Sequence, residues 1–217
     1  MSVEHPVPHV NARRAYNASR RQEQSRHKHN VLLDAALARF NQYGYTTTTI
    51  ESIAADADVS EATIYKTYGG KPGIVRALCL RALGGQGPVP AEQRSDALKA
   101  TEADPRKVIE GWGRLTAEVA PRVAPILLLL RDAADGDAAA AALREELDES
   151  RLARMTDNAR HLVDGGHLRP GIRLSHASDV LWTYSSPELF DLLVRQRHWS
   201  LRRYGSFVAG AIAAALL

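Results

Sequence analysis

The sequence predicts an all-α protein, and three observations support this fold class. Apolar residues make up 45% of the 217 positions while aromatic residues make up only 6%, so Ala and Leu dominate the candidate core. Apolar residues recur three and four positions apart along much of the chain, which is the spacing of one helix face. The only run of strand length that stands out, Tyr45–Ile50, overlaps a helix-capping pattern.

Residues 1–25 are expected to form a disordered basic arm, because they hold few large apolar residues and no helical stripe. Residues 1–30 contain six Lys or Arg against two acidic residues, whereas residues 31–83 contain five of each sign. The positive excess of the chain, +3 overall, therefore lies near the N-terminus. Two interpretations stay open: an arm that follows a nucleic-acid backbone, or a solvated tail.

A first helix is predicted from about Arg26 to Tyr43, and Gly44 is a typical C-terminal stop. Its apolar side consists of Val31, Leu32, Ala35, Ala36 and Phe40.

The stretch from Thr48 to Lys71 contains two short helical patterns joined by a tight link. The first pattern has an apolar side made of Ile50, Ile53, Ala54 and Ala57. Thr48 and Glu51 have the spacing of a capping box, which predicts the start of this helix. Ser60 is a good N-cap for the second helix, whose inward side is Ile64 and Tyr68. Two such helices joined by a three-residue turn predict a helix-turn-helix.

A further helix is predicted from Lys71 to Leu83, with Pro72 in its first turn. Residues 84–101 begin with glycines and prolines and continue with polar residues, which is typical of a domain boundary. The sequence thus predicts a domain over residues 26–83 and a larger one over residues 102–217.

The larger domain is predicted to be helical throughout. Asp104-Pro105 is a cap followed by a first-turn proline, and Pro121 and Pro125 are expected to interrupt the helix that follows. Further helices are predicted from Asp137 to Asp164 and after the caps Ser175, Ser186 and Ser200. The last helix is rich in Gly and Ala, which permits close approach of helices and suits the four-helix seam of a homodimer.

Several classes of protein are disfavoured by composition. The single cysteine, Cys79, cannot form a disulfide framework and fits a reducing, cytoplasmic location. The longest apolar runs are too short to cross a bilayer, and the polar start shows no signal-peptide pattern. The acidic cluster at residues 145–149 has no His at helical spacing, so we expect no metal site and no cofactor.

The region from about Val31 to Leu83 resembles the DNA-binding domain of the TetR family of transcriptional regulators. The matching residues are Phe40, Gly44, Tyr45, Thr48, Thr49, Ile50, Ile53, Ala54, Ala57, Val59, Ser60, Thr63, Ile64, Tyr65, Tyr68 and Lys71. A weaker likeness to actinobacterial-type members lies in Leu181, Trp182, Ser186, Pro187, Glu188, Leu189, Leu192 and Leu193. The resemblance implies an N-terminal three-helix DNA-binding domain and a larger C-terminal ligand-binding and dimerisation domain.

The resemblance also implies a homodimer that binds a palindromic double-stranded DNA operator and is released by a small-molecule effector of unknown identity. The predicted DNA-binding residues are Thr48, Thr49, Ser60, Glu61, Thr63, Tyr65, Lys66 and Lys71. Thr63 offers a hydroxyl and a methyl group to base edges, while Thr49 and Lys71 lie at helix starts and suit phosphates. Glu61 either accepts from a cytosine amino group or points away from the DNA.

The predicted effector-binding residues are Trp112, Leu127, Leu130, Arg131, Met155, Trp182 and Tyr184. The alternative for each is an ordinary core position. Arg131 pairs either with an acidic ligand or with an internal carboxylate such as Asp132 or Glu118. Two other functions compete with a ligand-responsive repressor: a DNA-binding protein without an effector, and an α-helical enzyme. The enzyme is disfavoured because no Ser/His/Asp or Cys/His spacing emerges, so no catalytic residue is predicted.

Overall fold

The computed structural model describes the backbone of residues 10–84 and 89–217, and the side chains of residue 20 and of residues 23–84 and 89–217. Within these ranges the chain is all-α, which confirms the predicted fold class. The N-terminal helices are α1 (Val10–Thr47), α2 (Ile50–Asp56), α3 (Glu61–Tyr68) and α4 (Lys71–Gly84). The C-terminal helices are α5 (Ala91–Thr101), α6 (Pro105–Ala134), α7 (Ala138–Asp164), α8 (Leu174–Tyr184), α9 (Pro187–Phe190), the π-helical η1 (Asp191–Gln196) and α10 (Leu201–Leu216).

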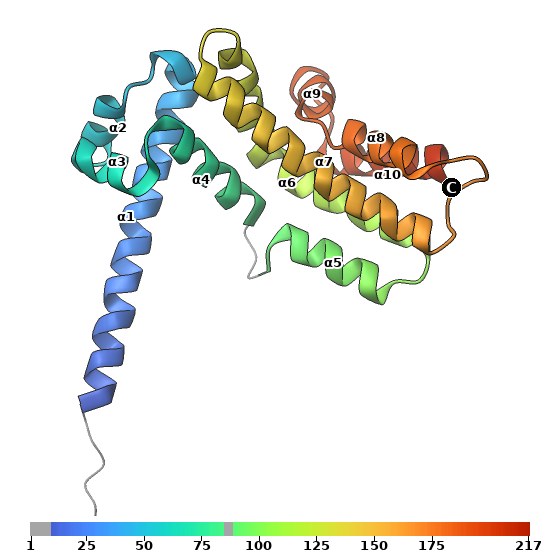
Figure 1. Cartoon of the computed structure of the whole chain (residues 1–217), viewed down its shortest axis with the longest axis horizontal. Coiled ribbons are helices and arrows are strands. Elements are labelled where there is room, and N and C mark those ends of the chain that lie inside the picture. The colour runs from blue at the N-terminus through green and yellow to red at the C-terminus, as the bar shows by residue number, and fades with distance from the viewer. Residues whose placement is uncertain (1–9, 85–88) are drawn as a thin grey trace, which may run out of the picture.

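Figure 1 shows α2, α3 and α4 gathered around the C-terminal half of α1, while the N-terminal half of α1 extends away from them. The long helices α6 and α7 pack against each other and form the centre of the larger part. Helix α10 packs on α6, α8 packs on α7, and α5 packs on α6.

The expectation of a disordered arm is corrected for residues 10–25, because α1 begins at Val10. This stretch is rich in Ala, Arg and Gln, which are strong helix formers. It also adds turns to a helix that the core already holds, so it does not have to nucleate its own first turn. Residues 1–9 lie outside the described residues. The predicted stop at Gly44 is confirmed, since Gly44 leaves helical geometry with φ +82°.

Two predicted interruptions are absent. Residues 91–101, expected to belong to the domain boundary, form α5, whose residues Ala91 and Ser95 are buried. Pro121 and Pro125 lie inside α6, which continues through both. A proline within a helix costs about 3 kcal/mol. Helix α6 offsets this cost because it is packed by α1, α4, α5, α7, α9 and α10.

Most predicted helix caps are confirmed. Asp104 Oδ1 accepts from the backbone N–H of Arg106 at 2.9 Å, and Asp137, Ser186 and Ser200 each accept from their own first turn. The cap predicted at Ser175 is wrong, since α8 begins at Leu174 and Arg173 is its N-cap.

The buried apolar residues form two clusters. The first contains the core of α1–α4, and it continues into the end of α6 and the start of α7 through Ile126, Leu130 and Leu143. The second joins α6, α7, α8 and α10 around Tyr204 and Leu162. The N-terminal helices therefore share one core with the tip of the α6–α7 pair.

Close approach of helices depends on glycine at two places. Where α6 and α10 cross, Gly113 and Gly205 each lie against the backbone of the other helix. At the start of α4, a Cβ on Gly73 would collide with the backbone carbonyl of Tyr68 in α3. The second contact fixes the angle between α3 and α4.

We predict that Gly73→Ala lowers the free energy of unfolding by about 1–3 kcal/mol, because the added methyl forces α3 and α4 apart. The control is Gly84→Ala in the same helix, where a Cβ meets nothing within 4 Å. That variant should be unchanged or more stable by up to about 1 kcal/mol, since Ala is the better helix former. Denaturant unfolding followed by circular dichroism measures both; equal behaviour of the two variants would contradict the proposed contact.

Candidate nucleic-acid interface and internal cavity

Helix α3 is attached to the protein along one narrow side. Ile64 is fully buried and Tyr68 is half-buried, while every other residue of the helix is exposed. Ser60 is the N-cap: its Oγ accepts from the backbone N–H of Thr63 at 3.3 Å and lies 2.9 Å from Thr63 Oγ1. The predicted start of this helix is confirmed, and most of its surface is free to contact another molecule.

Side chains of α1 contact both α3 and α2. The Tyr68 hydroxyl lies 2.6 Å from Nδ1 of His29, and the two rings stack with centroids 5.4 Å apart. Arg39 of α1 donates two hydrogen bonds to the Asp56 carboxylate of α2, one of them 2.7 Å long. These bonds hold the pKa of Asp56 below its usual range. These contacts with α1 hold α2 and α3 in place, and the exposed side of α3 stays on the surface.

The predicted capping box at Thr48 is corrected by one residue. Thr49 is the N-cap of α2, and its Oγ1 accepts from the backbone N–H of Ser52 at 3.1 Å. Thr48 is only 2% exposed, and its hydroxyl donates to the Gly44 carbonyl at 2.7 Å. The positive φ of Gly44 turns the chain so that Thr48 points inward, which its sequence pattern does not show. The side chain of Thr48 therefore cannot contact DNA as predicted, whereas Thr49 is exposed.

Lys71 is engaged inside the protein. Its Nζ donates to the carbonyl of Tyr45 at 2.9 Å and to that of Thr46 at 3.4 Å. The ammonium also lies 4.4 Å from the centroid of the Tyr45 ring. Burial lowers the pKa of Lys71 from its usual value. Its side chain ties the start of α4 to the last residues of α1, and two of the three N–H groups of the ammonium are engaged there.

Five predicted residues remain together on the exposed surface of α3 and its cap, namely Ser60, Glu61, Thr63, Tyr65 and Lys66. They offer hydroxyl, carboxylate and ammonium groups, and Tyr65 is 55% exposed. An exposed helix carrying such groups at its N-terminal half matches the way a recognition helix meets base edges in the major groove.

A partly open cavity of about 210 Å³ lies where α4 meets the helices of the larger part. Its walls come from α4, α5, α6, α7, α8 and α10, with further residues around the start of α9. Three predicted effector-binding residues, Trp112, Leu127 and Met155, line it. Cys79 and Leu83 of α4 line it too, so one wall belongs to a helix that also packs in the N-terminal core.

The other four predicted effector-binding residues are not on the cavity wall. Leu130 is fully buried in the first apolar cluster. Trp182 stacks on the guanidinium of Arg151, and Tyr184 meets Phe207 edge to face. Helical spacing alone does not distinguish these core positions from wall positions.

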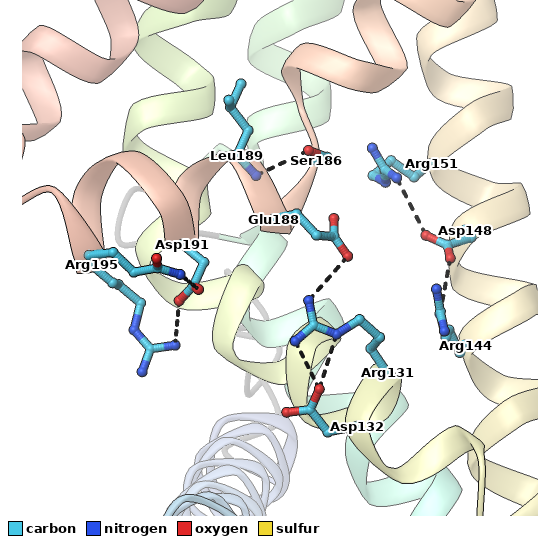
Figure 2. Close-up of polar contacts among 11 residues, drawn as sticks. Arg131, Asp132, Arg144, Asp148, Arg151, Ser186, Glu188, Leu189, Asp191 and Arg195 are labelled. Atoms are coloured by element: carbon cyan, nitrogen blue, oxygen red, sulfur yellow. Dashed lines mark hydrogen bonds and ion pairs between the residues drawn. The ribbon is translucent and has the colours of Figure 1, made fainter.

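Arg131 points toward carboxylates of the protein (Figure 2). Its Nη2 lies 2.8 Å from Asp132, and its Nη1 lies 3.7 Å from Glu188 of α9. The internal carboxylate Asp132 is therefore its partner, as one of the two interpretations expected. Glu118 instead accepts two hydrogen bonds from Arg94 at 2.7 Å.

Sequence reasoning missed polar residues of the cavity wall, among them Ser95, Arg151 and Asn158. Ser95 was assigned to a linker, and Asn158 and Arg151 resemble ordinary surface positions of a long helix. The available signal was their spacing with Met155, since positions 151, 155 and 158 lie on one side of α7.

Residues 32–78 match the family model described as bacterial regulatory proteins of the tetR family. The matched segment contains α2, α3 and the parts of α1 and α4 that support them. Residues 32–78 therefore carry the helix-turn-helix domain of the tetR family, which confirms the predicted resemblance.

A curated relative in Bacillus subtilis (strain 168) is also described as a helix-turn-helix regulator. It is described as the uncharacterized HTH-type transcriptional regulator YvkB and is 37% identical over 68 residues. The match spans 31% of this chain and 36% of that relative, so it covers only about a third of the relative's length.

Solved structures share the fold over most of the chain. A putative TetR-family regulator from Syntrophomonas wolfei has a TM-score of 0.69 at 18% identity and covers 89% of this chain and 98% of its own. FadR from Bacillus subtilis in complex with stearoyl-CoA has a TM-score of 0.67 at 17% identity, and the match covers 86% of this chain and 98% of FadR. A SmeT–triclosan complex has a TM-score of 0.68 at 19% identity, and the match covers 88% of this chain and 91% of SmeT. At these identities the likeness is one of fold alone.

Within residues 10–84 and 89–217, no group of three or more His, Cys, Asp or Glu side chains is placed to hold a metal ion. In the same ranges no helix combines the length and the apolar character that crossing a membrane requires.

The contacts of Lys71 and Lys66 predict different effects of removing each charge. Lys71→Met should lower the free energy of unfolding by about 1–2 kcal/mol, because the carbonyls of residues 45 and 46 lose their donor. Lys66→Met should leave stability unchanged, because Lys66 is exposed. It should instead reduce the slope of the logarithm of DNA affinity against the logarithm of salt concentration by about one. Urea unfolding and binding titrations at several salt concentrations measure this pair. A Lys71→Met protein that keeps full stability would argue for the original role of Lys71 as a phosphate contact.

Proposed function

We propose that this TetR-family regulator is a homodimeric, ligand-responsive repressor that binds a palindromic operator and is released by a small molecule. The observation that supports this most is the exposure of α3. Its two inward residues hold it, and Thr63, Tyr65 and Lys66 are left on the surface. Thr63 and Tyr65 contact bases or phosphates in this proposal, and Lys66 neutralises a phosphate.

Apolar surface on η1 and α10 supports the homodimer. Leu192, Leu201 and Phe207 are each at least 40% exposed. The small residues of α10 that the sequence suggested for a dimer seam divide into two groups. Gly205 and Ala209 are buried against α6 of the same chain, while Gly210 and Ala214 remain exposed beside Phe207. A second copy that covers this surface would place two α3 helices on one duplex, and two-fold symmetry then requires a palindromic site.

The position of α4 supports the ligand response. Its C-terminal half lines the cavity through Cys79 and Leu83, and its first turn is in contact with α3 at Gly73. Arg76 of α4 also donates to Glu146 of α7, with Nε 2.9 Å from Oε1. A ligand that fits the cavity in only one arrangement of α4 would favour that arrangement, and the spacing of the two α3 helices would change with it.

Two alternatives are less well supported. A DNA-binding protein without an effector would have no use for a cavity that borders α4. An α-helical enzyme would leave the exposed surface of α3 without a role. The proposed location is the cytoplasm, where the DNA lies.

We predict that Thr63→Ala combined with Tyr65→Ala abolishes sequence-specific DNA binding. Both side chains are exposed, so the fold and the dimer should be unaffected. Enrichment of duplexes from a randomised pool measures specificity, and analytical ultracentrifugation measures the dimer. The wild type should enrich one sequence class, and the double variant should bind all duplexes alike.

The matched control is Thr101→Ala combined with Glu145→Ala, two exposed positions on α5 and α7. This protein should select the same sequences as the wild type. An unchanged preference in the Thr63 and Tyr65 double variant would show that another surface contacts the bases.

A further inference from the structure

The cavity is compact and mostly apolar. Aliphatic side chains of α6 and α10, including Leu115, Val119, Val208 and Ile212, form much of its wall. A cavity of about 150 Å³ holds benzene, so one of 210 Å³ has room for roughly eight to ten non-hydrogen atoms. Its apolar walls favour a ligand with an aliphatic or aromatic body of that size.

Arg151 brings a buried positive charge to this wall from α7. Its side chain is 15% exposed, and its Nη1 donates to the Trp182 carbonyl at 2.7 Å and to Ser185 Oγ at 3.2 Å. Its guanidinium lies 4.2 Å from the centroid of the Trp182 ring. Nε of Arg151 is buried without a hydrogen-bond partner among the described residues. Such a group gains free energy from an acceptor, because an unpaired buried donor is costly.

The carboxylate nearest to Arg151 compensates its charge only in part. Asp148 lies 3.4 Å from Nη2 of Arg151, and it also lies 3.6 Å from Arg144, so two guanidinium groups share it (Figure 2). Burial lowers the pKa of Arg151, which means that its surroundings do not fully support the positive charge. A second negative group close to Arg151 would therefore be stabilised.

The remaining polar groups of the wall are consistent with an excess of positive charge. Arg154 lines the cavity and pairs with Asp96 at 2.8 Å, and Glu92 is the sole acidic residue in the lining that is described. Ser95 Oγ, Trp112 Nε1 and Asn158 Oδ1 are buried in the wall and have no hydrogen-bond partner in the described part of the chain. Two of these three groups can donate a hydrogen bond to an acceptor on a ligand.

We propose that the effector is a compact monocarboxylic acid of about eight to ten non-hydrogen atoms in all, whose carboxylate binds beside Arg151 and whose apolar body fills the cavity. This proposal rests on the proposed ligand response for its biological meaning, but its chemistry is independent of DNA. The carboxylate completes the hydrogen bonds of Arg151, and the body covers the aliphatic wall and contacts α4 at Cys79 and Leu83.

The test compares octanoate with octanamide, which has the same size and no charge. Isothermal titration calorimetry on the full chain without DNA should show octanoate binding at least ten-fold more tightly than octanamide. Equal affinities for the two compounds would overturn the proposal, and so would the absence of measurable octanoate binding.

Two variants assign the preference to Arg151. Arg151→Met should bind octanoate and octanamide with affinities within about two-fold of each other. Arg131→Met is the matched control: Arg131 also pairs with a carboxylate, but it is not on the cavity wall, so its variant should keep the preference of the wild type. A preference that survives in Arg151→Met would place the carboxylate elsewhere and overturn the assignment. Should Arg151→Met fail to fold, the ratio measured on the wild type still decides the proposal.

A separate readout distinguishes this proposal from the ligand response. DNA binding is measured by fluorescence anisotropy with each compound present. Octanoate that binds the protein without releasing DNA would contradict the ligand response and leave the carboxylic acid assignment standing. Release of DNA by octanamide as readily as by octanoate would contradict the acid assignment and leave the ligand response standing.

Discussion

The structure depends on the packing of α4 between two parts of the chain. On one side Ile74 and Leu78 complete the apolar core of the N-terminal helices. On the other side Cys79 and Leu83 form a wall of the cavity. At its start, Gly73 lies against the backbone of α3 so closely that no side chain fits between them. Because protein interiors are densely packed, a helix held in this way cannot shift at one end without moving its neighbours at the other.

The two parts of the chain are joined by more than a linker. The first apolar cluster includes residues at the end of α6 and the start of α7, so the helix-turn-helix is built on the tip of the larger part. Polar contacts reinforce this junction: Arg76 bonds to Glu146, and Arg122 of α6 donates to the Ala82 carbonyl at the end of α4. The exposed Arg76 pair is worth little in stability, about 0–1 kcal/mol, so the shared apolar core contributes most to this junction. In contrast, α3 has few attachments, which leaves its outer surface for a partner.

Much of the fold follows from local sequence signals, and the departures have physical causes. Asp104, Asp137, Ser186 and Ser200 mark helix starts because capping is decided within one turn of the chain. The continuity of α6 through Pro121 could not be predicted, because it depends on tertiary packing that offsets a local cost. The dependence on tertiary packing also limits what the sequence predicts about the α3 surface and the cavity. Exposure of α3 follows from its own pattern, but the inward turn of Thr48 depends on the conformation of Gly44. The wall of the cavity depends on which sides of six helices meet. Wall residues such as Arg151 are therefore identified from the structure and not from the sequence.

The proposed binding mode places α3 in the major groove of DNA in two copies related by a two-fold axis. Affinity cleavage from α3 tests it most directly. Thr63→Cys places an exposed thiol for an iron–EDTA reagent, while Cys79 is 2% exposed and burial raises the pKa of its thiol to about 12, so it stays unlabelled. We expect two symmetric clusters of strand cuts on a selected duplex, with centres roughly 34–36 Å apart or a multiple of that distance. A reagent on Glu145→Cys, far along the chain on α7, should give no such pair. Two outcomes with the reagent on residue 63 would contradict this binding mode. One is an even spread of cuts along the duplex, and the other is a single cluster without a symmetric partner.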